Sequence, residues 1–183
     1  LPSRTYWAVG AAMCYIGAEF CISLWGVQLI EERAGLTTAA ASAGLGTFLG
    51  GLFVGRALGS GPARRIDAER LLRGVLIAGI VLFGATWIAS SAWLLLPSFF
   101  LTGVGLSLCY PLTLARVLRA AGGRVDRAAA INLAASTAAI GAAPFVLGGL
   151  AGSVSVHAAF LIVPVLLVAA LVLVVAAPVP DVD

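Results

Sequence analysis

A carboxyl group stands in the middle of an apolar run: residues 14–25 read CYIGAEFCISLW, with Glu19 near the centre. A charged carboxylate facing lipid would cost at least about 2.5–3.5 kcal/mol, so an ionisable residue at such a place is expected to face a cavity or a partner. Tyr15, Glu19 and Ser23 follow one another at four-residue steps and therefore share one helix face. Desolvation favours the neutral acid. We interpret Glu19 as the holder of a transported proton or as a substrate ligand; the alternative is a protonated side chain that only joins two helices.

Two further polar features lie in later apolar runs. Tyr110 and Pro111 fall in the inner half of one run, where proline loosens a helix and nearby side chains must satisfy the freed carbonyl. This pair predicts a gating bend, with a tolerated kink as the alternative. Asn132 and Ser136 form a four-step polar pair near the start of the next run and could line the same cavity as Glu19.

Arg56 ends a run that is rich in small residues. Gly46 and Gly50, and then Gly51 and Gly55, repeat at four-residue spacing before it. Small residues at this spacing let two membrane helices approach closely. A cation at the end of such a helix complements the helix dipole and can bond carbonyls of the next helix. We expect this contact to hold one conformation until the helices move apart.

The composition indicates a membrane protein. Of 183 residues, 61% are hydrophobic and 10% are charged, and the mean hydropathy is +1.09. The eleven basic residues are all arginines that cluster between long apolar runs, a pattern typical of membrane topology signals and not of nucleic-acid binding. The cysteines Cys14, Cys21 and Cys109 show no zinc-type or redox spacing, so we expect small core side chains and no metal or cofactor.

Six segments are long and apolar enough to cross a bilayer as helices: roughly 7–30, 38–58, 71–90, 93–118, 128–151 and 158–177. Ten of the eleven arginines fall on one side of these spans, and Arg33 falls on the other. By the positive-inside bias, both termini are expected to be cytoplasmic. The sequence predicts a single all-α bundle of six transmembrane helices.

The six spans follow a repeated order of character. The first and fourth carry the polar residues, the second and fifth are rich in small residues, and the third and sixth are bulky and aliphatic. This order predicts two three-helix repeats, interior second and fifth spans, and lipid-facing third and sixth spans. An odd number of spans per repeat inverts the second copy, as expected of a secondary transporter.

Two other classes of membrane protein are alternatives to a transporter. A six-span intramembrane serine protease needs a serine in a Gly-x-Ser-Gly setting and a histidine buried at matching depth. The nearest candidates are Ser107, which lacks the second glycine, and His157 at the outer mouth of the last span. A channel would carry a repeated polar lining, whereas Glu19 is the one acidic residue within these spans. Both patterns favour a transporter over these alternatives.

Several stretches carry a family resemblance. Residues 15–19, YIGAE, followed by Trp25, resemble the Tyr-x-Gly-x-Glu run that opens helix seven of sugar-permease-like transporters. Residues 51–56, GLFVGR, resemble the second copy of the signature loop Gly-x-x-x-Asp-Arg-x-Gly-Arg-Arg, with glycine at position 55 in place of the acid. Residues 108–112, LCYPL, resemble a proline-bearing helix ten. The chain as a whole resembles the carboxyl-terminal half, helices seven to twelve, of a major facilitator superfamily transporter.

The resemblance implies alternating access, in which two six-helix halves rock around a central site lined by helices seven and ten. It implies a small-molecule substrate such as a sugar, or an exported metabolite or drug, with protons as the coupling ion. It also implies a partner: an amino-terminal six-helix half upstream in a longer polypeptide, or a second half-transporter. We expect an integral protein of a bacterial cytoplasmic membrane.

Overall fold

The structure, a computed structural model, describes residues 1–59, 61 and 66–179, and within these residues it is helical without strands. Arg64 and Arg65, which the sequence analysis counted among the cytoplasmic arginines, lie outside the described residues. The helices are α1 (Ser3–Ala34), α2 (Thr38–Gly59), α3 (Ala68–Ile88), α4 (Ala92–Leu106), α5 (Cys109–Arg119), α6 (Val125–Ala151), α7 (Val156–Ala159) and α8 (Ile162–Ala176).

These helices form six candidate membrane spans, and the prediction of six spans is confirmed. Four spans are single helices, whereas α4 and α5 together form the fourth span and α7 and α8 the sixth. Both interruptions precede a proline at the third position of the following helix, Pro111 in α5 and Pro164 in α8. A proline has no N–H for the carbonyl four residues earlier, which explains a break at each place.

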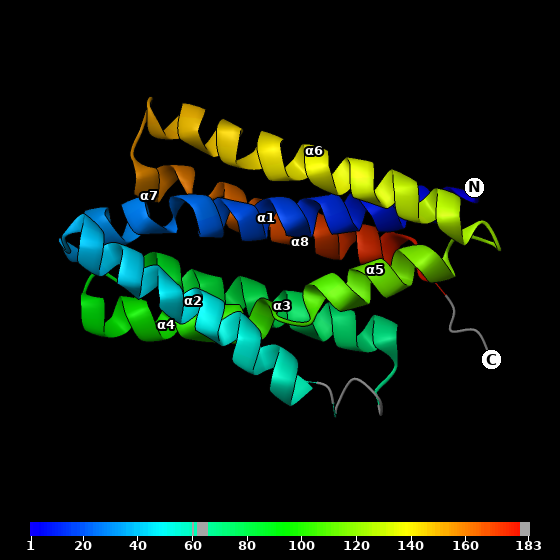
Figure 1. Cartoon of the computed structure of the whole chain (residues 1–183), viewed down its shortest axis with the longest axis horizontal. Helices are drawn as coiled ribbons and strands as arrows, with labels where there is room; N and C mark the ends of the chain where they lie inside the picture. The colour runs from blue at the N-terminus through cyan, green and yellow to red at the C-terminus, as the bar shows by residue number, and fades with distance from the viewer. Residues whose placement is uncertain (60, 62–65, 180–183) are drawn as a thin grey trace.

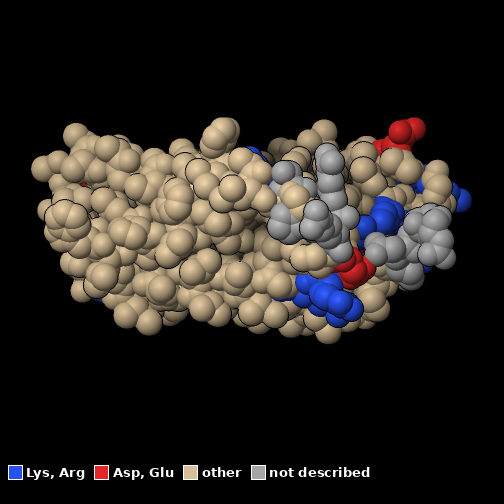
Figure 2. Space-filling view, turned by 90° about the horizontal axis from the view of Figure 1, so that it is seen from below, with Lys and Arg blue, Asp and Glu red and all other residues tan. Residues whose placement is uncertain are grey.

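Most of the charged residues gather at one end of the bundle, whereas Glu31, Glu32 and Arg33 lie at the other. Figure 1 shows the N-terminus and the α5–α6 connection at the more charged end, together with the last turns of α2 and α8 and the first turn of α3. Figure 2 shows most of the arginines and acids of the visible face gathered there. An even number of spans brings the termini to the same side. The placement of this end in the cytoplasm stays a prediction from the positive-inside bias.

Spans one to three pack in the same way as spans four to six. The first span, α1, packs along α6 and α8, and the fourth span, through α4, packs in the same way along α2 and α3. The spans α1 and α5 also contact each other, as do α3 and α8. This correspondence is the arrangement that two inverted three-helix repeats produce.

A seam of glycines joins α2 to α4. A side chain at Gly51 would meet the backbone of Phe100, and one at Gly103 would meet the backbone of Phe48. The expected close approach of small residues is therefore found at Gly51 and Gly55. At Gly46 and Gly50, however, a side chain would meet nothing within 4 Å, so this half of the glycine pattern does not face a helix of the chain.

Within the chain itself, the fifth span is not an interior helix. Among the six spans α1 is the most buried and α6 the least. The reason is that α6 packs on α1 along one face, while Leu133, Phe145 and Leu150 on its other faces are exposed. The small residues of α6 therefore pack on α1 along one face only, and the opposite face is exposed.

Candidate functional site

Four helices line a cavity of about 340 Å³ that is open on one side. Its walls come from α1, α2, α5 and α6, so all of the spans that carry polar or small residues contribute to it. The lining residues are Ile16, Glu19, Phe20, Arg56, Tyr110, Leu133, Ser136, Thr137 and Ile140. The sequence-predicted residues Glu19, Arg56, Tyr110 and Ser136 thus meet in one place although they come from four different helices.

Glu19 is held in the cavity wall by its own helix. Tyr15 lies one turn earlier on α1, is fully buried, and donates its phenolic hydroxyl to Oε2 of Glu19. Because Tyr15 is fixed in the core, this hydrogen bond orients the carboxyl group toward the cavity. Ser23, the third member of the predicted stripe, is half-buried and does not belong to the lining. Of the three polar residues on this helix face, only Glu19 reaches the cavity, and Tyr15 orients it there.

Arg56 lines the cavity from α2 and reaches the break in the fourth span. Its Nε donates to the backbone oxygen of Ser107 at 3.3 Å, in the interruption between α4 and α5. Tyr110 and Pro111 follow directly on α5, and both side chains are exposed in this chain. The predicted bend and the predicted arginine contact are thus parts of one local structure.

The polar pair on α6 is divided by the structure. Ser136 lines the cavity and is 8% exposed, and its Oγ has no hydrogen-bond partner among the described residues. Asn132 is 5% exposed, and its Oδ1 likewise has no partner in the described part of the chain. Asn132 lies outside the cavity lining. A buried polar atom without a partner loses free energy, so Ser136 is suited to bind a group that enters the cavity.

The structure separates the two residues of the protease alternative. Ser107 is buried and donates its hydroxyl to the backbone oxygen of Val104. His157 stacks on Trp87, with ring centroids 4.3 Å apart, and its Nε2 lies 2.9 Å from the Trp87 backbone oxygen. Neither residue is directed at the other. Within the described residues, no three His, Cys, Asp or Glu side chains come together in a way that could hold a metal ion.

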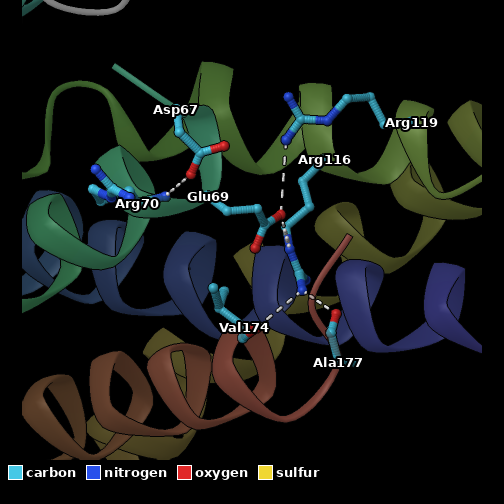
Figure 3. A network of polar contacts seen from close by, with 7 residues as sticks. All are labelled: Asp67, Glu69, Arg70, Arg116, Arg119, Val174 and Ala177. Atoms are coloured by element: carbon cyan, nitrogen blue, oxygen red, sulfur yellow. Dashed lines mark hydrogen bonds and ion pairs between the residues drawn. The ribbon is translucent and has the colours of Figure 1, made fainter. Parts of the chain in front are cut away.

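Sequence reasoning missed a second polar cluster at the charged end of the bundle. Arg116 on α5 has no exposed surface, and its Nε bonds Oε1 of Glu69 on α3 at 2.7 Å. Its Nη2 also donates to the backbone oxygens of Val174 at 3.2 Å and Ala177 at 2.5 Å, at the end of α8. Figure 3 shows one guanidinium joining the three spans. Arg119 adds a weaker ion pair with Glu69 at 3.7 Å.

A signal for this cluster was present in the sequence. Arg116 lies on the buried side of α5, at helical spacing from Cys109, Leu112 and Thr113. An arginine at a core position of an amphipathic helix indicates a buried partner, although its place between two apolar runs is also typical of a topology signal. The acidic partner, Glu69, lies in the first turn of α3, whose start Asp67 caps by accepting the N–H of Arg70 at 2.7 Å.

The fold is shared with solved structures of the fucose transporter FucP. The chain superposes on the outward conformation of FucP with a TM-score of 0.87 and 19% sequence identity, covering 96% of this chain and 42% of FucP. A second structure, of a variant of the E. coli fucose:proton symporter FucP, gives a TM-score of 0.85 at 18% identity. The chain therefore has the fold of one six-helix half of a major facilitator superfamily transporter, and the resemblance drawn from the sequence is confirmed at the level of the fold.

Curated relatives point in the same direction. The chain is 28% identical over 151 residues to the glucose/galactose transporter of Brucella abortus biovar 1 (strain 9-941), and equally to that of strain 2308. These matches cover 80% of this chain and 36% of each relative, so the chain spans about a third of their length. No family model matches the chain. The matched proteins are transporters and not enzymes.

Proposed function

We propose that the chain is the carboxyl-terminal half of a secondary transporter that moves a sugar-like solute together with protons by alternating access. The observation that carries the proposal is the Glu19 carboxyl group, which Tyr15 holds in a mid-span cavity that Arg56 and Tyr110 also line. An ionisable group inside a membrane span is costly to hold there, and this cost supports a functional role. The named functions of the FucP and Brucella relatives support the same class of activity.

The donors and acceptors of the cavity fit a solute with several hydroxyl groups. Glu19 accepts hydrogen bonds, Arg56 donates them, and the hydroxyls of Ser136 and Tyr110 do both. Phe20 and Ile140 supply apolar wall on the same cavity, against which the carbon face of a sugar ring can pack. The lining therefore combines hydrogen-bond donors, hydrogen-bond acceptors and apolar side chains in one small cavity, which is the usual composition of a small-molecule site.

A second six-helix half is part of the proposal, since the chain covers less than half of each matched transporter. That half belongs to the same polypeptide or to a partner, and it would close the open side of the cavity. We place the complete transporter in a bacterial cytoplasmic membrane. Export of a metabolite or drug is the alternative, and the direction in which a pH gradient drives the solute distinguishes export from uptake.

The role of Glu19 is tested by comparing two transport modes in proteoliposomes that contain the complete transporter. Glu19→Gln keeps the shape and removes the exchangeable proton, so we expect proton-driven accumulation to fall to the level of empty vesicles. Exchange of labelled for unlabelled solute should persist, because it needs no net proton movement. Glu31→Gln is the matched control: the same change on the same helix, outside the cavity lining. Unchanged rate and unchanged pH dependence in Glu19→Gln would contradict the proposal.

A further inference from the structure

The break in the fourth span leaves one particular carbonyl without its helical donor. In an uninterrupted helix, the N–H of residue 111 would bond the oxygen of residue 107, but Pro111 has no N–H. The backbone oxygen of Ser107 instead accepts from Nε of Arg56 at 3.3 Å. A side chain of α2 therefore replaces the missing backbone donor of the fourth span. The donor is charged, and the distance lies at the long end of the hydrogen-bond range.

The glycine seam explains how Arg56 reaches this carbonyl. A side chain at Gly55 would meet Oγ and Cβ of Ser107 and the backbone oxygen of Val104. Without a Cβ at position 55, the α2 backbone lies directly on the break, and the next residue, Arg56, extends across it. The departure from the family signature at position 55, where glycine stands in place of an acid, has this structural consequence.

The same guanidinium shares a cavity with Glu19. Because both side chains line this cavity, a negative charge on the Glu19 carboxylate attracts the Arg56 guanidinium. The titratable groups around Glu19 are Tyr15 on its own helix, Arg56 on α2, and Cys109 and Tyr110 on α5. The residues that α6 brings to the cavity, such as Ser136 and Thr137, are uncharged.

We infer that Arg56 is a positioning residue that transmits the protonation state of Glu19 to the bend of the fourth span. While Glu19 is protonated, the guanidinium stays on the Ser107 oxygen and stiffens the break. When the Glu19 proton passes to water in the cavity, the carboxylate attracts the guanidinium, Ser107 loses its donor, and α5 is free to bend against α4. The inference rests on the proposed function, since it links the proton carried by Glu19 to the bending of α5 against α4.

Hydrogen exchange tests this inference without measuring transport. The complete transporter in lipid nanodiscs is followed across a pH series, and the exchange of peptides covering residues 107–115 is corrected for the intrinsic rate with a free peptide. In the wild type we expect corrected exchange to rise about tenfold with pH, the change that loss of one hydrogen bond gives. In Glu19→Gln, exchange should stay at every pH at the slow rate that the wild type shows at low pH. In Arg56→Gln, it should stay at the fast rate that the wild type shows at high pH.

A rescue variant and a matched control sharpen the experiment. Pro111→Ala restores a backbone N–H for the Ser107 oxygen, so adding it to Arg56→Gln should return exchange to the slow rate. Arg33→Gln is the control, because Arg33 also donates to helix-end carbonyls, those of Ile88 and Ala89, but at the outer end of the bundle. It should leave residues 107–115 as in the wild type. A pH response in Arg56→Gln equal to that of the wild type would overturn the inference.

The inference and the proposed function fail in different ways. If exchange follows the predicted pattern while no solute is driven by protons, the pH-dependent bend stands and the transport proposal is wrong. If proton-driven transport is found while exchange at residues 107–115 ignores Glu19 and Arg56, the transport proposal stands and the coupling through Arg56 is wrong.

Discussion

At the scale of the residue, the molecule holds two carboxyl groups in two different ways: Glu69 is buried and Glu19 is half-buried. Glu69 is paired with Arg116, a guanidinium with no exposed surface that also bonds two backbone oxygens of the last span. Glu19 is bonded by the neutral hydroxyl of Tyr15 and faces a cavity. A carboxylate paired with a buried cation ties helices together, whereas a carboxyl group that faces a cavity can be reached by water and solute. The first arrangement suits structure and the second suits proton transfer.

Removing Arg116 should destabilise the fold strongly. Arg116→Gln leaves the buried Glu69 without its main cation and two helix-end carbonyls without a donor, a loss of about 3–5 kcal/mol for a broken buried ion pair. The check is the free energy of unfolding in detergent micelles. Arg127→Gln, at an exposed position at the same end of the bundle, is the matched control and should change little. Equal stability of the two variants would show that the cluster does not hold the spans together.

At the scale of the element, the contact between α2 and α4 depends on where glycines fall and not on how many there are. Gly51, Gly55 and Gly103 lie where two backbones meet, so a Cβ has no room. Gly46 and Gly50 are on the same helix but face away from its partner. The seam places Arg56 on the break of the fourth span, which links helix packing to the candidate site.

A pair of adjacent glycine substitutions tests the seam. Gly51→Ala would force a methyl group against the backbone of Phe100, so we expect a lower melting temperature in detergent and slower solute exchange. Gly50→Ala adds the same methyl group where nothing lies within 4 Å, and helix propensity favours alanine by about 1 kcal/mol. Its melting temperature should stay equal or rise. A seam without importance would give both variants the same behaviour.

The sequence predicts the features that depend on residues close together along the chain. Apolar length and arginine placement predicted six spans, and the cost of a buried carboxyl group singled out Glu19. What could not be predicted depends on which helix faces which. The four-residue glycine pattern does not say that Gly51 faces α4 while Gly50 faces away, and Arg116 looked like a topology signal until its partner Glu69 was placed beside it. Asn132 and Ser136 share a helix face, yet only Ser136 lines the cavity.

At the scale of the whole molecule, the chain has the architecture of half a transporter. Its packing repeats between spans one to three and four to six, and its fold matches one half of FucP with a TM-score of 0.87. The cavity is bounded by α1, α2, α5 and α6, and the exposed side of α6 adjoins it through Leu133. In the proposed transporter, a second half on this open side would complete the enclosure that alternating access requires.

The most direct test of this account is accumulation of labelled sugar by proteoliposomes that contain the complete transporter under an acid-outside pH gradient. Glucose, galactose and fucose are the first solutes to try, because the matched proteins are named for them. The account predicts that at least one of them accumulates above its external concentration and that a protonophore abolishes the excess. Accumulation that survives the protonophore, or no gradient-dependent movement of any sugar in either direction, would contradict proton-coupled sugar transport.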